Sequence, residues 1–176
     1  MNRKVVSVLL TTLAFTFSST SVSQAWFVSS KKDDFGSNYV TINTYYVSDL
    51  GQFDDLQELA DRDDEILISL TIRCRDRVLE VYSGYLHTVS DDTVLDDSQS
   101  KVQVKFNNGK VKNWPVSSTP SAVFYENTKV FLKTLLASKS FAVRAQGDTG
   151  LGVAANFKLS GLSGYKSTLK SAGCSV

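Results

Sequence analysis

The chain contains few of the residues that bind metals or act as catalytic nucleophiles. Its 176 residues include one histidine, His87, and two cysteines, Cys74 and Cys174. Structural zinc normally takes four nitrogen or sulfur ligands, so this supply argues against a zinc site. A catalytic triad could pair His87 with Asp91 or Asp92 and a serine, but no nucleophile motif accompanies it. We therefore expect His87 to be an exposed structural residue, and the sequence predicts no catalytic residue and no cofactor.

Long apolar runs are also scarce, and the single candidate lies at the start of the chain. A basic pair, Arg3 and Lys4, precedes the apolar run Val5–Phe17, and small residues follow up to Ala25. This order is typical of a secretory signal peptide that is cleaved after Ala25. A transmembrane anchor is the alternative, but a span needs about 20 apolar residues. We expect residues 1–25 to be a signal peptide and residues 26–176 to form a single domain, periplasmic or secreted.

Neither sign of charge is in excess. Loss of Arg3 and Lys4 would reduce the 19 basic residues to 17, against 18 acidic residues, a net charge near −1. This balance gives no reason to expect nucleic acid or an anionic membrane as partner. The expected partners are instead an envelope protein or a cell-wall component.

The stretch Ile66–Cys74 predicts the centre of the fold. Its apolar residues alternate with Ser69, Thr71 and Arg73, as in a strand with one buried face. Cys74 has the apolar parity, so its side chain should point into the core. Two cysteines in an exported chain favour a disulfide, and a loop of about 100 residues closed in this way could be stabilised by several kcal/mol. The alternative is one buried free thiol and one thiol near the chain end.

The remaining pattern predicts an α+β fold, mainly antiparallel β as a sheet or sandwich, with one inserted helix and a C-terminal helix, closed by the disulfide. Asn108-Gly109 predicts a tight hairpin whose return strand ends at Pro115. The acidic stretch Ser90–Ser100 is expected to be an exposed loop. Further strands are expected over Trp26–Ser37 (followed by a turn), Tyr39–Val47, Val78–His87, Val102–Phe106, Phe141–Ala145 and Val153–Leu159. Helices are expected over Leu50–Ala60, Thr128–Ser138 (apolar face Val130, Phe131, Leu132 and Leu135) and Leu162–Leu169.

Two acidic clusters suggest calcium, but neither carries a binding motif. In the run from Asp61 to Glu65, an EF-hand loop would need glycine at its sixth position, where the chain has Ile66. The run that contains Asp91 and Asp92 has no motif either. Solvated turns account for both clusters. A carboxylate pair for glycoside hydrolysis is recognised by distance in space, so the sequence leaves it open.

Aromatic residues on the expected strands suggest a binding surface. They could line a groove for a sugar or a peptide, or serve as core residues and cross-strand pairs. The expected binding surface comprises Trp114, His87, Asp91 and Asp92. The aromatic residues considered for a groove are Trp26, Tyr45, Tyr46, Tyr82, Tyr85 and Trp114.

The motifs between Ile66 and Cys174 occur in a distinctive order. A cysteine strand is followed by VQVKFNNGKVKNWPVSS, the FLKTLL helix, FAVRAQ, ANFKLSGL and a closing cysteine. This order resembles the small exported proteins associated with type VI secretion, the TagO/VasI-like family. KFNNGKV departs from the family, which often has an arginine-aspartate pair before the tryptophan. The matching positions are Trp26, Cys74, Trp114, Phe131, Leu135, Arg144, Phe157, Gly161, Leu162 and Cys174.

The resemblance implies a periplasmic accessory or binding protein without known catalysis. Recognition would use strand edges and the loops around Trp114 and Ser90–Ser100. One alternative is an envelope hydrolase, acting on peptidoglycan or peptide through His87 or a carboxylate pair. Another is a small exported inhibitor or exclusion factor.

Overall fold

The computed structural model describes residues 26–32, 38–47, 51–52, 66–87, 94–147, 150 and 152–176. The expected signal peptide, the acidic run Asp61–Glu65, and Asp91 and Asp92 lie outside these residues, as does most of the helix expected over Leu50–Ala60. Within the described ranges, no helix has the length and apolar character that a membrane crossing requires.

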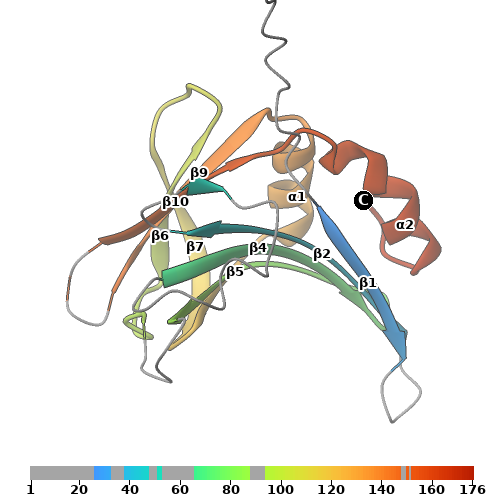
Figure 1. Ribbon diagram of the computed structural model, residues 1–176, viewed down its shortest axis with the longest axis horizontal. Helices are drawn as coiled ribbons and strands as arrows, with labels where there is room; N and C mark the ends of the chain where they lie inside the picture. Colours follow the sequence, from blue (N-terminus) through green and yellow to red (C-terminus); the bar gives the residue numbers. More distant parts are fainter. Residues whose placement is uncertain are drawn as a thin grey trace, which may run out of the picture.

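The described strands form one strongly curved antiparallel sheet (Figure 1). Its order is β1-β2-β4-β5-β8-β7-β6-β9-β10, and the two-residue strand β3 pairs with β2. The strands are β1 (Phe27–Lys32), β2 (Asn38–Val47), β3 (Gly51–Gln52), β4 (Ile66–Arg75), β5 (Val78–His87), β6 (Lys101–Phe106), β7 (Lys112–Thr119), β8 (Ala122–Tyr125), β9 (Ser140–Gln146) and β10 (Gly152–Lys158).

Strand β7 forms the corner of the sheet. Its first half pairs with β6 and its second half, from Val116, pairs with β8. The prediction that Pro115 ends this strand is wrong, because the proline lies where the strand changes partner. Its missing N–H is not needed there, while its carbonyl accepts the Glu126 N–H at 3.1 Å. Beyond the corner, β10 crosses over β2, and the rings of Phe157 and Tyr46 lie 6.1 Å apart.

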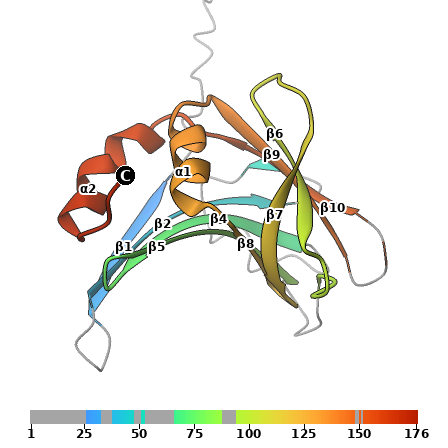
Figure 2. The ribbon, with the colours of Figure 1, turned by 180° about the vertical axis from the view of Figure 1, so that it is seen from behind.

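Two helical segments lie on the same face of the β1-β2-β4-β5 part of the sheet (Figures 1 and 2). Helix α1 (Thr128–Leu136) is inserted between β8 and β9, and the 3-10 helix η2 (Leu162–Tyr165) leads into α2 (Lys166–Ser171). Phe131, Leu132 and Leu135 of α1 are fully buried against the sheet. Val130 was predicted on the same apolar face, but it is 58% exposed. One residue turns the helix by about 100°, so a neighbour of Phe131 can face the solvent.

The fold class and the disulfide are confirmed. Ile68, Leu70, Ile72 and Cys74 are all buried, as their shared parity predicts. Cys74 is bonded to Cys174, with 6.0 Å between their Cα atoms. Gly173, at φ +90°, ends α2 in the left-handed conformation, and the next N–H, of Cys174, donates to the Leu169 carbonyl at 3.0 Å. This cap turns the chain back so that Cys174 meets the end of β4.

The tight hairpin lies at a different place from the predicted one. Strands β4 and β5 are joined by two residues, Asp76 and Arg77, both with positive φ, as a type I′ turn requires. The predicted tight turn at Asn108-Gly109 is wrong, because the pairing of β6 with β7 extends only to Val104 and Lys112. In the wider loop, Asn107 accepts the Lys139 N–H at 2.6 Å through its side chain. This contact with the start of β9 holds the loop open.

Two further local expectations are corrected, and one strand had not been predicted. Val94 and Leu95 were expected in an exposed loop, but both are buried and both donate their N–H to the Pro120 carbonyl. Gly51 and Gln52, expected to begin a helix, pair with β2 as a strand. Strand β8 was not predicted, because its four residues are too few to show a period.

Candidate binding surface

The face of the sheet that lies opposite the helices carries a continuous row of side chains. The register aligns one residue from each of five adjacent strands, β1, β2, β4, β5 and β8. The row runs through Phe27, Asn43, Thr71, Tyr82 and Phe124. Its parity is opposite to that of the buried residues Ile72 and Val81, so the row lies outside the core.

Pairs of aromatic rings contact one another along this face. Phe27 and Tyr45 have ring centroids 5.6 Å apart, and Tyr82 and Phe124 have centroids 5.0 Å apart. Thr71, between the two pairs, is only 4% exposed although it points away from the core. Its burial indicates that larger neighbours cover it, so these side chains form a packed layer.

An arginine-glutamate pair adjoins the aromatic row. The guanidinium carbon of Arg73 lies 5.3 Å from the centroid of the Tyr82 ring, a cation–π geometry. Its Nε–H donates to Glu80 Oε2 at 2.6 Å, and both side chains are about one third exposed. We call the set Phe27, Tyr45, Arg73, Glu80, Tyr82 and Phe124 the outer aromatic face.

The ionisation of this face follows from these contacts. The hydrogen bond to Glu80 raises the pKa of the Arg73 guanidinium, although burial acts in the opposite direction. Burial, followed by the nearby Tyr82 hydroxyl, raises the pKa of Tyr45. Both pKa shifts favour the form that prevails at neutral pH, the charged guanidinium of Arg73 and the neutral phenol of Tyr45.

Of the predicted surface residues, the structure describes Trp114 and the backbone of His87, and these two positions lie apart. Trp114 donates its Nε1–H to the Glu126 carbonyl at 2.9 Å, and its ring packs 4.9 Å from the Phe131 ring. His87 ends β5 opposite Ile66, and its side chain is not among those described. Gly84 of β5 pairs with a residue of β8 that in turn pairs with Thr119, near the end of β7. His87 thus lies beyond one end of β7, whereas Trp114 lies towards the other end.

The other aromatic residues are divided between the core and the surface. Tyr85 is buried in the core, and Tyr46 is partly buried and packs against the core residue Phe157. Trp26 donates its Nε1–H to the Ser160 carbonyl at 2.9 Å, which fixes the entry to β1 beside η2. Tyr45 and Tyr82 are the residues of the expected groove that lie on the outer aromatic face.

Sequence analysis did not select Arg73, Glu80 or Phe124. The signal that could have found the first two is the strand parity, since Arg73 has the parity of Thr71 and Glu80 that of Tyr82. Pairing two strands that are adjacent in the chain would then have placed both residues on one face. Phe124 depended on the contact of β5 with β8, which has no local sign in the sequence.

Among the described residues, no group of three or more His, Cys, Asp or Glu side chains is placed to hold a metal ion. Asp96, from the second acidic cluster, accepts hydrogen bonds from the Ser98 N–H at 2.9 Å and the Ser98 hydroxyl at 2.6 Å. These bonds lower the pKa of the Asp96 carboxyl and assign it to a local turn. No protein-family model, curated protein or solved structure matches the chain.

Proposed function

We propose that this chain is an exported, non-enzymatic binding protein that recognises a protein partner through the outer aromatic face. The observation that carries the proposal is the row of packed aromatic rings joined to the Arg73–Glu80 pair on the face opposite the helices. Tyrosine and arginine are enriched among the residues that dominate protein–protein binding energy. Aromatic rings on strands also offer a large contact area with few rotatable bonds.

The arrangement reduces the entropic cost of binding. Arg73 is held by a charge-assisted hydrogen bond and by the Tyr82 ring, so its long side chain is ordered before any partner arrives. Ordering such a side chain on association would otherwise cost about 0.5–1.5 kcal/mol. A preformed surface of this kind favours binding over catalysis, which needs a reactive group aimed at a substrate.

The cellular role that we propose is accessory to an envelope machine, with type VI secretion as the specific candidate. The support is the leader pattern of residues 1–25, the resemblance to the TagO/VasI-like family, and the Cys74–Cys174 bond. Structural disulfides persist in oxidising compartments such as the periplasm and the cell exterior. Periplasmic or secreted localisation is part of the same proposal.

The test is a pull-down from envelope extract with the protein that begins at Trp26, compared with its Tyr82→Ala and Arg73→Ala variants. We expect one protein to be recovered in stoichiometric amount, and at least about tenfold less of it with either variant, as for a binding hot spot of at least about 1.4 kcal/mol. The matched control is Lys101→Ala, on the exposed side of β6, which should recover the wild-type amount. Circular dichroism verifies that each variant is folded.

Two results would contradict the proposal. Equal recovery of the same partner by all four proteins would place binding on another surface. Turnover of peptidoglycan or peptide by the purified protein, abolished by His87→Ala, would establish a hydrolase instead.

A further inference from the structure

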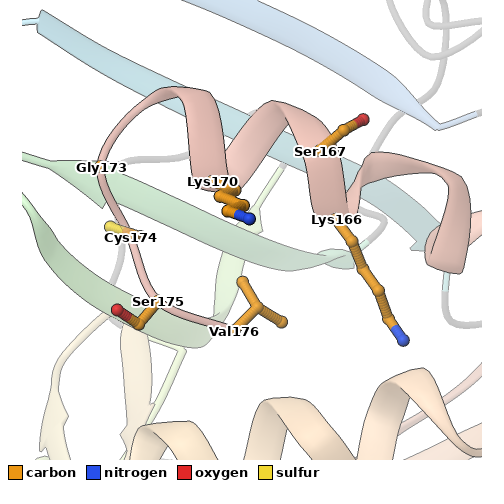
Figure 3. Close-up of a pocket in the computed structure, with 7 residues that line it drawn as sticks. All are labelled: Lys166, Ser167, Lys170, Gly173, Cys174, Ser175 and Val176. Atoms are coloured by element: carbon orange, nitrogen blue, oxygen red, sulfur yellow. The ribbon is translucent and has the colours of Figure 1, made fainter.

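Two hollows adjoin at the C-terminal end of the chain. The first, of about 400 Å³, is formed by α2 and the residues after it, with Lys166, Lys170 and Val176 at its wall (Figure 3). The second, of about 590 Å³, lies between the β4–β5 turn and the start of α1. Gly173 and Ser175 line both hollows, so the two adjoin along the end of the chain. We call them together the C-terminal groove.

Every charged side chain that lines the groove is a cation. These residues are Arg77, Lys129, Lys166 and Lys170. The nearby Asp76 directs its carboxylate to Arg75, at 3.8 Å. In the described part of the chain, none of the four cations takes part in an ion pair. These four cationic side chains outweigh the terminal carboxylate of Val176, which also lines the first hollow, so the potential of the groove is positive on balance although the whole chain is nearly neutral.

Arg77 occupies a backbone conformation that suits another residue better. Its φ is 68°, in the second position of a type I′ turn where glycine is favoured. The chain end packs closely against its side chain, because a Cβ atom on Gly173 would lie 3.0 Å from Arg77 Cγ. An arginine is thus kept at a strained position and packed against the groove, a pattern found more often at functional sites than elsewhere.

Exposed apolar side chains accompany the cations. Val130 and Val176 line the groove and are 58% and 38% exposed, and Val78, next to Arg77, is 60% exposed. The disulfide fixes one side of the first hollow, because Cys174 lines this hollow and is bonded to Cys74. A ligand for this surface needs negative charge together with apolar groups.

We propose that the C-terminal groove binds an acidic segment of a protein partner in which aspartate or glutamate residues alternate with apolar residues. The carboxylates pair with Arg77, Lys129, Lys166 and Lys170, and the apolar side chains contact the exposed valines. A chain segment can enter a hollow between α1 and α2, whereas a flat lipid surface cannot follow its walls. The groove and the outer aromatic face share no residue, so the two proposals fail independently.

The first experiment selects peptides from a random displayed library on the immobilised protein that begins at Trp26, with its own C-terminus untagged. We expect the enriched peptides to be acidic with interspersed apolar residues, and we expect no such enrichment on the Lys166→Glu/Lys170→Glu variant. Enrichment of uncharged or basic peptides, or equal enrichment of acidic peptides on both proteins, would overturn the proposal.

The second experiment measures the binding of the most enriched peptide by fluorescence anisotropy. The charge-reversed variant should weaken binding by at least about tenfold, and a rise from 50 to 200 mM salt should weaken binding to the wild type, since the contacts are ionic. The double variant Lys101→Glu/Lys105→Glu, on β6 away from the groove, is the matched control and should bind as the wild type does. Loss of binding in this control would show that net charge, rather than the groove, attracts the peptide.

Arg77→Gly separates binding from folding. Glycine relieves the positive φ, so this variant should melt at a higher temperature than the wild type and still bind the peptide several-fold more weakly. Unchanged peptide affinity would remove Arg77 from the site.

The last experiment measures binding to vesicles of phosphatidylglycerol and phosphatidylcholine. If the groove cations mediate vesicle sedimentation while the library yields no acidic peptide, the occupant is a lipid surface and the proposal is wrong.

Discussion

Tyr85 and Tyr125 are both buried, but they differ in whether the hydroxyl group makes a hydrogen bond. The Tyr125 hydroxyl lies 2.7 Å from the Ser83 hydroxyl, deep in the core. Tyr85 is buried beside them, but within the described structure its hydroxyl makes no hydrogen bond. Burial raises the pKa of both phenols well above the ordinary value, so both stay neutral at physiological pH. The interior therefore contains one satisfied and one unsatisfied phenol.

We predict opposite effects for the two conservative replacements. Tyr125→Phe keeps the ring stacked on Phe131, at 3.9 Å, but leaves the buried Ser83 hydroxyl without its partner, so it should lower the free energy of unfolding by about 1–3 kcal/mol. Tyr85→Phe removes an unpaired polar group and should leave stability unchanged or raise it by up to about 1 kcal/mol. Urea unfolding of both variants measures the difference, and equal losses would contradict the assignment.

Helix α1 illustrates how an element gains its stability from packing. It has no side-chain cap at Asn127 and no acidic residue in its first turn, so local signals support it weakly. Its buried residues, Phe131, Leu132 and Leu135, face the sheet, and Phe131 lies within 5.6 Å of the Phe106, Trp114, Tyr125 and Phe141 rings. The helix is therefore stabilised mainly by tertiary burial.

Leu135→Ala should accordingly destabilise the protein by about 2–5 kcal/mol, through lost burial and the cavity left behind. Val130→Ala, on the same helix, removes an exposed side chain and should change stability by less than about 0.5 kcal/mol. Thermal and urea unfolding of this matched pair test which face of α1 is packed. Similar losses in the two variants would mean that the burial pattern is wrong.

At the scale of the whole molecule, the disulfide joins the centre of the sheet to the chain end across 100 residues. A loop of that length restricts the unfolded chain strongly, and the chain-entropy model gives about 4.7 kcal/mol for it. The bond also holds Gly173 beside Arg77, and Gly173 and Ser175 line both hollows of the groove.

Replacement of both cysteines by alanine should therefore lower the free energy of unfolding by about 2–5 kcal/mol. The urea midpoint measures this loss, and a reductant should lower the midpoint of the wild type but leave that of the double variant unchanged. A reductant effect on the double variant, or none on the wild type, would show that the bond contributes no stability.

The candidate surface was only partly predictable. Tyr45 and Tyr82 were identified as aromatic residues on strands, and the parity of Arg73 was recognised, but nothing local indicated that β2 and β8 flank the β4–β5 hairpin. Trp114 was expected at the surface as one of the aromatic residues that could line a groove for a sugar or a peptide. Its hydrogen bond to Glu126 and its ring contacts arise from the β7 corner, which depends on strand pairing distant in the chain.

By itself, the sequence determined the properties that depend on local period and on composition. The alternation of apolar and polar residues in Ile66–Cys74 predicted a strand and its buried face, and helical spacing predicted α1. The disulfide was predicted because the chain has two cysteines, one on the buried face of that strand and one near the chain end. Only the tertiary structure decided which strands are neighbours, where β7 turns through Pro115, and how Asn107 opens the loop that Asn108-Gly109 predicted to be tight. The reason is physical: side-chain direction follows from the backbone period of a single segment, whereas strand order and the surfaces built on it minimise the exposed apolar area of the whole chain.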